Sequence, residues 1–136
     1  MHHRFGLGLL KSANQLAVGG DELYVCDTNN HRLQVFSLTG EHRRSIVGEW
    51  GTPMRLCFAK DRLYLAEADG DDDYEEGDEW FKAPVNGRRV LVLSLQGDIL
   101  QVVTHSTEPT ADFERICCFD GKLLATYHYY THSATV

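Results

Sequence analysis

The sequence repeats one short pattern three times, and this repetition constrains the fold more than any other feature. The first copy, Leu16–Gly40, has the pattern of a strand, a glycine-containing tight turn, a second strand, an Asp/Asn turn and a third strand. Its first residue has counterparts at Leu56 and Ile116, so the copies start about 40 and then about 60 residues apart. Repeats of about 40 residues made of short strands are typical of β-propeller blades. The sequence therefore predicts an all-β fold, a partial β-propeller built from four-stranded antiparallel blades.

The repeats also predict how the chain is divided. The segments are residues 1–12 as the end of a preceding blade or a connector, 13–50 as blade 1, 51–105 as blade 2 with an acidic insertion at 68–87, and 113–136 as a partial blade 3. Alternation in the third strand of blade 1 places Leu33 and Val35 on one side and Gln34 and Phe36 on the other. Arg44–Val47 is expected to form an outer strand.

Composition limits the classes of partner. The net charge is −7, and most of the acidic excess lies between Asp69 and Glu79, so the chain lacks the basic surface on which sequence-independent binding of nucleic acid depends. No apolar run approaches the roughly 20 residues that span a bilayer, and no signal peptide is recognised, so no membrane partner is expected. The four cysteines all lie in apolar, strand-like runs, which favours buried thiols and a reduced, cytoplasmic location.

The most specific stretch is Leu23–Phe36, LYVCDTNNHRLQVF, which resembles the core of the NHL repeat family, "xYVxDxxNHRIQVF". In the second copy Glu67 replaces the Asp and Arg89 opens the following strand, and in the third copy Tyr127 stands at the acidic position. The resemblance implies blades of a propeller that usually has six of them, whereas this chain holds about two and a half.

Two and a half blades leave apolar sheet faces without a neighbour, because a propeller covers its blade faces by closing a ring. The chain is then a piece of a longer protein, a truncated gene product, or a protein that assembles with itself through the open blade faces. The sequence favours the first two explanations.

No catalytic motif, phosphate-binding loop or paired Cys-x-x-Cys occurs, so we expect no catalytic residue, no cofactor and no metal ligand. The resemblance then favours a non-catalytic scaffold that binds a protein partner. Its binding surface is expected on the face that carries the Asp27–Arg32 loop and the acidic insertion. For the Asp27–Arg32 loop itself the favoured interpretation is structural: Asp27 and Asn30 fix the turn, and Arg32 braces a neighbouring blade or a carboxylate. The alternative is a contact patch in which His31 and Arg32 offer hydrogen-bond donors. The candidate protein-binding residues are Asn29, Asn30, His31, Arg32, Tyr74, Trp80 and Phe81.

Two other functions remain open. Some NHL propellers bind single-stranded RNA on a basic face, for which the candidates here are Arg32, Arg43, Arg44, Arg55, Arg88 and Arg89, although the acidic insertion should repel RNA. The second alternative is a fragment of a metal-dependent propeller lyase, which would need histidines from more blades than this chain has. The insertion does not fit an EF-hand, because Tyr74 and Trp80 occupy the positions that need Gly and Glu, while weaker binding of divalent cations is left open.

Overall fold

The computed structural model describes residues 9–10, 13–68, 86–104 and 112–128. In these ranges the chain forms ten strands and one short 3₁₀ turn, η1 (Thr28–Asn30). The strands are β1 (Ala13–Gly19), β2 (Glu22–Asp27), β3 (Arg32–Ser37), β4 (His42–Ile46), β5 (Thr52–Ala59), β6 (Arg62–Ala68), β7 (Asn86–Leu93), β8 (Ile99–Thr104), β9 (Asp112–Phe119) and β10 (Lys122–His128).

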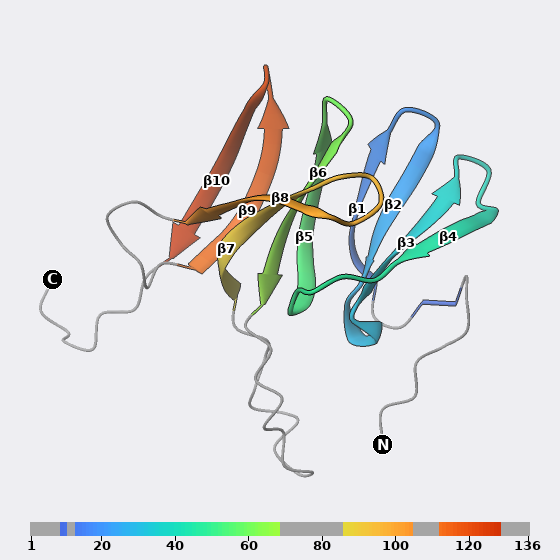
Figure 1. Ribbon diagram of the computed structural model, residues 1–136, viewed down its shortest axis with the longest axis horizontal. Coiled ribbons are helices and arrows are strands. Elements are labelled where there is room, and N and C mark those ends of the chain that lie inside the picture. Colours follow the sequence, from blue (N-terminus) through green and yellow to red (C-terminus); the bar gives the residue numbers. More distant parts are fainter. Residues whose placement is uncertain (1–8, 11–12, 69–85, 105–111, 129–136) are drawn as a thin grey trace, which may run out of the picture.

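The strands form three antiparallel sheets in chain order. Two sheets have four strands, β1-β2-β3-β4 and β5-β6-β7-β8, and the third consists of β9 and β10. The first strands of the sheets lie beside one another, β1 next to β5 and β5 next to β9, and the later strands fan outwards from them (Figure 1). This arrangement of radiating antiparallel sheets confirms the prediction of an all-β, partial propeller fold. Blade 1, blade 2 and blade 3 below mean these three sheets.

The strand pairing makes the three repeats equivalent at the level of single residues. Leu16 pairs with Val25 in blade 1, Leu56 with Leu65 in blade 2, and Ile116 with Ala125 in blade 3. Because the register is the same, a position in one blade has a definite counterpart 40 or 100 residues further along.

The first turn of each blade has positive φ, as a two-residue hairpin turn requires. In blade 1 the turn uses Gly20, at φ 60°, as expected from the sequence. In blade 2 the non-glycine residues Lys60 and Asp61 take φ values of 49° and 58°. In blade 3 Asp120 and Gly121 adopt the same conformation.

Two hydrophobic cores lie between neighbouring blades. The first joins Leu33 and Val35 of blade 1 to Leu56, Leu65 and other leucines of blade 2. The second joins blade 2 to blade 3; its buried residues are Ala66, Val90, Phe113 and Ile116. Alternate residues of each strand therefore serve opposite faces of a blade, as the period of two predicts. The alternation expected in β3 is confirmed, because Leu33 and Val35 lie in the first core whereas Gln34 and Phe36 do not.

Side chains on the inner strands fix how blade 2 sits on blade 1. The rings of Tyr24 and Phe58 stack with centroids 5.9 Å apart. A Cβ atom added to Gly19 would lie 2.2 Å from the Phe58 ring, so only glycine allows this ring to approach the backbone of β1. The side-chain oxygen of Gln15 also accepts a hydrogen bond from the Leu56 backbone N–H at 3.1 Å. The two blades therefore pack as one unit.

No helix in the described ranges has the length and apolar character needed to cross a membrane.

Candidate functional site

The loop between β2 and β3 is built around the buried carboxylate of Asp27. The Nδ2 atom of Asn30 and the Nε atom of Arg32 each donate a hydrogen bond to Asp27 Oδ2, both at 2.9 Å. All three side chains are buried. The Thr28 hydroxyl, also buried, donates to the Pro53 carbonyl oxygen of blade 2 at 2.9 Å. Because both the carboxylate and the guanidinium are removed from water, their pairing holds this loop in one conformation.

The same loop presents two side chains outwards. Asn29 and His31 are exposed, in contrast to their neighbours. His31 adopts the left-handed conformation, with φ 54° and ψ 40°, and its backbone N–H donates to the Thr28 carbonyl oxygen at 3.1 Å. Its Nδ1 atom lies 3.4 Å from the Thr52 hydroxyl at the start of β5. The loop therefore holds the His31 side chain beside the connector that leads into blade 2.

Blade 2 repeats the ion pair of blade 1. Glu67 is buried at the position equivalent to Asp27, and its carboxylate pairs with the Nε atom of Arg89. The other carboxylate oxygen accepts a hydrogen bond from the Gly51 backbone N–H at 2.6 Å. The longer glutamate thus still pairs with the first arginine of the following strand. The two ion pairs differ in exposure to solvent. The Arg89 side chain is 42% exposed, whereas that of Arg32 is only 7% exposed.

Two arginines of the RNA candidate set lie at the opposite end of the blade. Arg44 Nη1 lies 2.7 Å from Glu22 Oε2, and Arg43 Nη1 lies 3.3 Å from the same atom. Glu22 begins β2, directly after the turn at Gly20, whereas the Asp27 loop follows the other end of that strand. Burial alone would raise the pKa of Glu22, but the hydrogen bonds from Arg44 and Arg43 lower it below its ordinary value.

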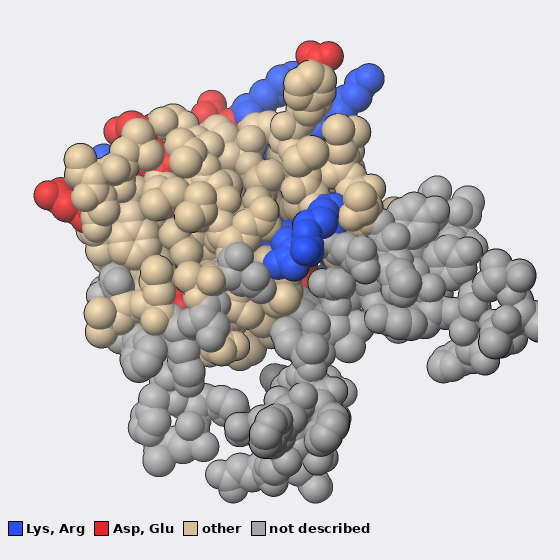
Figure 2. Space-filling model, turned by 180° about the vertical axis from the view of Figure 1, so that it is seen from behind, with Lys and Arg blue, Asp and Glu red and all other residues tan. Residues whose placement is uncertain are grey.

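The remaining described arginines of that set lie towards the loop end. Arg32 is buried on Asp27, Arg89 is paired with Glu67, and Arg55 is half-buried near the start of β5. Burial, and then the nearby charge of Arg115, lower the pKa of Arg55. Seen from behind, Lys, Arg, Asp and Glu side chains gather along the upper rim, and most of the described surface below it is uncharged apart from one basic group near its centre (Figure 2). The described arginines are therefore divided between the two ends, and most have carboxylate partners.

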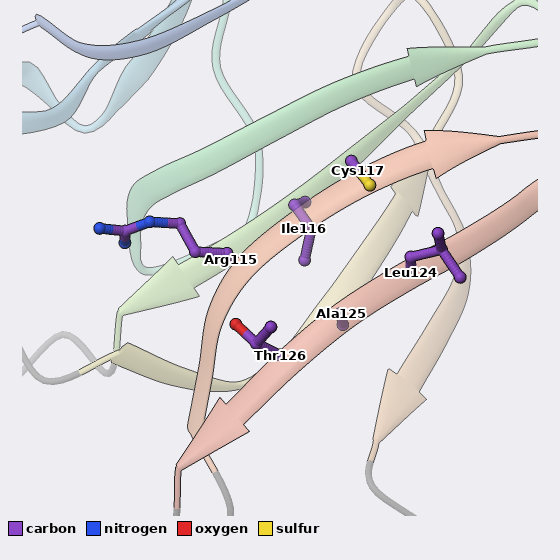
Figure 3. A pocket seen from close by; sticks show the side chains of 6 residues that line it. All are labelled: Arg115, Ile116, Cys117, Leu124, Ala125 and Thr126. Carbon is purple, nitrogen blue, oxygen red and sulfur yellow. The ribbon is translucent and has the colours of Figure 1, made fainter.

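The described residues hold no group of three or more His, Cys, Asp or Glu side chains that could bind a metal ion. A shallow pocket of about 190 Å³ lies on the outer face of β9 and β10 (Figure 3). It is lined by Arg115, Ile116, Cys117, Leu124, Ala125 and Thr126. The lining has no histidine or carboxylate, and Cys117 is the one residue in it whose side chain is a thiol.

Several predicted site residues lie outside the described residues. These are Tyr74, Trp80 and Phe81, together with most of the acidic insertion and the side chain of Arg88. The possible binding of cations by the insertion therefore stays a prediction. Among the described candidates, Asn29 and His31 are exposed, and Asn30 and Arg32 are buried in the Asp27 cluster.

Comparison with known proteins agrees with the repeat pattern. Residues 10–36 match a family model described as "NHL repeat". The matched range includes β1, β2 and η1 and nearly all of β3, and so contains the whole Asp27 cluster. A search of curated proteins found no match to this chain.

Proposed function

We propose that this chain, whose residues 10–36 match the NHL repeat model, is a non-catalytic propeller segment that binds a protein partner. The binding surface is the loop end of blades 1 and 2, where Asn29 and His31 are exposed beside Thr52. The partner contacts these two side chains, while Asn30 and Arg32 hold the loop in place from below.

The observation that carries this proposal is the fixed loop itself. A buried carboxylate with two charged or polar donors immobilises the backbone on which Asn29 and His31 stand. Binding residues are commonly found on loops that a rigid scaffold positions. A loop that is already ordered loses little conformational entropy on binding, which favours affinity.

The proposal is tested by placing a photo-crosslinking amino acid at one site at a time. Positions 29 and 31 probe the loop end. The matched controls at the other end are two exposed lysines, Lys60 in the β5–β6 turn and Lys122 at the start of β10. We expect one protein to be captured from positions 29 and 31 and not from the two controls. That protein is then purified, and its affinity for the chain is measured with and without His31→Ala.

For a central contact, His31→Ala should weaken binding by about tenfold, equivalent to about 1.4 kcal/mol. Lys122→Ala should leave the affinity unchanged. Capture with equal efficiency from both ends, or unchanged affinity in the double variant Asn29→Ala/His31→Ala, would contradict the proposed surface.

RNA binding has less support, because Arg43 and Arg44 share Glu22 and Arg32 is buried on Asp27. Phosphate contact by these side chains requires the loss of an existing ion pair. A gel shift with single-stranded RNA that persists at moderate salt and is abolished by Arg55→Ala would favour RNA over a protein partner. The cytoplasmic location expected from the cysteines stays a prediction.

A further inference from the structure

The two outermost sheet faces expose apolar side chains. We call the side of blade 1 turned away from blade 2 the N-face; its most exposed apolar side chains on β1 are Leu16 and Val18, each 57% exposed. We call the side of blade 3 turned away from blade 2 the C-face; it exposes Phe119 at 71% and Leu124 at 49%, beside Cys117. Leu16 and Val18 are neighbours on one side of β1, and Phe119 and Leu124 lie on the adjacent strands β9 and β10. Exposed apolar side chains that gather in this way mark interaction surfaces.

The inner blade faces show what covers the equivalent positions. Leu56 is the counterpart of Leu16 and is only 1% exposed, because it packs into the core against blade 1. Tyr24 is the counterpart of Leu124 and is also 1% exposed, because it packs into the same core from the other side. The N-face and C-face therefore have the same residue positions as two halves of an interface that this chain already contains.

At one position of the interface, the residue sizes on the N-face and C-face are also complementary to each other. Between blades 1 and 2, the small residue Gly19 accepts the large ring of Phe58. The counterpart of Gly19 on the C-face is Phe119, and the counterpart of Phe58 on the N-face is Val18. The bulky residue is now on the C-face and the smaller one on the N-face, so the two faces would again place a large side chain against a smaller one. Close packing favours such paired changes.

The pocket on the C-face lies where this contact requires it. Its lining includes Cys117 and Leu124, the counterparts of Ala17 and Tyr24 (Figure 3). In the blade 1–blade 2 core, Ala17 and Tyr24 are buried together with Leu56. By equivalence, the pocket of about 190 Å³ at Cys117 and Leu124 corresponds to the place that Leu56 fills on blade 1, and Leu16 is the residue of the N-face equivalent to Leu56.

The exposed part of the N-face also matches the part of a blade that the C-face provides. Arg32 Nη2 and Gln34 Nε2 donate to the Leu9 carbonyl oxygen, at 2.9 and 3.2 Å, so Leu9 lies against the N-face at β3. The exposed residues Leu16 and Val18 are on β1, the innermost strand. Blade 3 has only an inner pair of described strands, β9 and β10, and so needs only the inner part of the N-face.

We propose that this chain associates with a second copy of itself in a head-to-tail manner, the N-face of one copy docking on the C-face of the other as blade 2 docks on blade 1. Leu16 and Val18 of one copy contact Cys117, Phe119 and Leu124 of the next. The interface is heterologous, so an open oligomer keeps one free N-face and one free C-face until a ring closes. This inference does not depend on the proposed protein-binding surface, which lies at the loop end.

The test uses two charged variants, Val18→Lys and Phe119→Arg, on the whole chain. Both residues are exposed, so the variants should fold as the wild type does. By size exclusion with light scattering, we expect the wild type to form a discrete oligomer and each variant to have the mass of one chain, 15.4 kDa. Mixing the two variants should give a 1:1 heterodimer, because one retains an intact C-face and the other an intact N-face.

Leu38→Lys is the matched control, since Leu38 is 59% exposed but lies in the turn after β3, outside the strands β1, β9 and β10 that carry the proposed contact. It should leave the oligomer unchanged. A wild-type chain that stays monomeric at every concentration overturns the proposal, as does a mixture of the two variants without a heterodimer. Assembly that survives in either single variant also overturns it, because it points to contacts between two identical faces.

A size exchange provides a second, independent test. Val18→Phe and Phe119→Gly should each weaken association at least tenfold, by crowding or by emptying the contact. The double variant restores the Phe–Gly pair of the first interface and should associate more tightly than either single variant. Alkylation of Cys117 should also be slower in the wild-type oligomer than in monomeric Val18→Lys. Additive losses in the double variant, or equal alkylation rates, count against the interface.

Discussion

The Asp27–Arg32 ion pair provides a sharp test of how the repeats are stabilised. Replacing Asp27 with Asn keeps the shape of the side chain and one oxygen acceptor but removes the negative charge. The Arg32 side chain is 7% exposed and that of Asp27 is fully buried, so the guanidinium loses the counter-charge of Asp27 in a site largely closed to water. Breaking a buried pair in this way costs about 3–5 kcal/mol.

The change in Tm follows from the unfolding entropy. For a chain of 136 residues, an entropy of about 2.1 cal/mol/K per residue converts this loss into a fall in Tm of roughly 10–17 °C. Thermal and denaturant unfolding of the wild type and the variant, followed by far-UV circular dichroism, measures both quantities. Protein concentration must be matched, because any self-association adds to the apparent stability.

Blade 2 supplies the matched control for this experiment. Glu67→Gln removes the charge of the equivalent carboxylate, but its partner Arg89 is 42% exposed and can be solvated. Glu67→Gln should therefore lower the free energy of unfolding by about 0–1 kcal/mol, as the loss of an ion pair near the surface does. The double variant Asp27→Asn/Arg32→Met should recover much of the loss, because no buried charge remains without a partner. Burial does not determine the contribution of these ion pairs if Asp27→Asn unfolds like the wild type. The same holds if Glu67→Gln lowers the free energy of unfolding as much as Asp27→Asn does.

Two further predictions concern packing and pH. Gly19→Ala places a Cβ atom 2.2 Å from the Phe58 ring and should destabilise the fold by about 1–3 kcal/mol, with partial recovery in Gly19→Ala/Phe58→Leu, as measured by denaturant unfolding. Burial raises the pKa of Cys26 from 9.0 to about 12, so between these values the unfolded chain has lost a proton that the folded chain retains. Stability should therefore be unaffected by this thiol below pH 9.0 and should fall by about 1.4 kcal/mol per pH unit towards pH 12. Cys26→Ala should reduce that slope in unfolding experiments across the range, and an unchanged slope would show that Cys26 does not contribute.

The repeat spacing was sufficient to predict the fold, because each copy carries its own turn and strand pattern. The equivalence of Leu16, Leu56 and Ile116 follows from the sequence and recurs in the strand register. The structural interpretation of the Asp27 loop was also accessible, since Asp and Asn followed by Arg favour a braced turn. For residues 28–30 the sequence predicted a turn, but not that this turn is a short 3₁₀ helix, η1.

Other features depend on which strands meet and could not be predicted. Arg43 and Arg44 were grouped with Arg32 as basic residues, but antiparallel pairing carries them to the end of the blade at Glu22. A sequence pattern gives the side of a strand to which a residue points, not the partner that lies opposite. The burial of Arg32 was likewise not predicted, because it depends on contact with the Leu9 carbonyl oxygen in a different segment.

The central claim is that successive blades pack face to face through their inner strands. The most direct measurement is a nuclear Overhauser spectrum of the isotope-labelled chain, observing the rings of Tyr24 and Phe58, whose centroids are 5.9 Å apart. We predict cross-peaks between the two rings, in addition to those between Tyr24 and its cross-strand partner Val35. Cross-peaks within blade 1 without any between Tyr24 and Phe58 would mean that the blades fold but do not pack on one another, and would contradict the account.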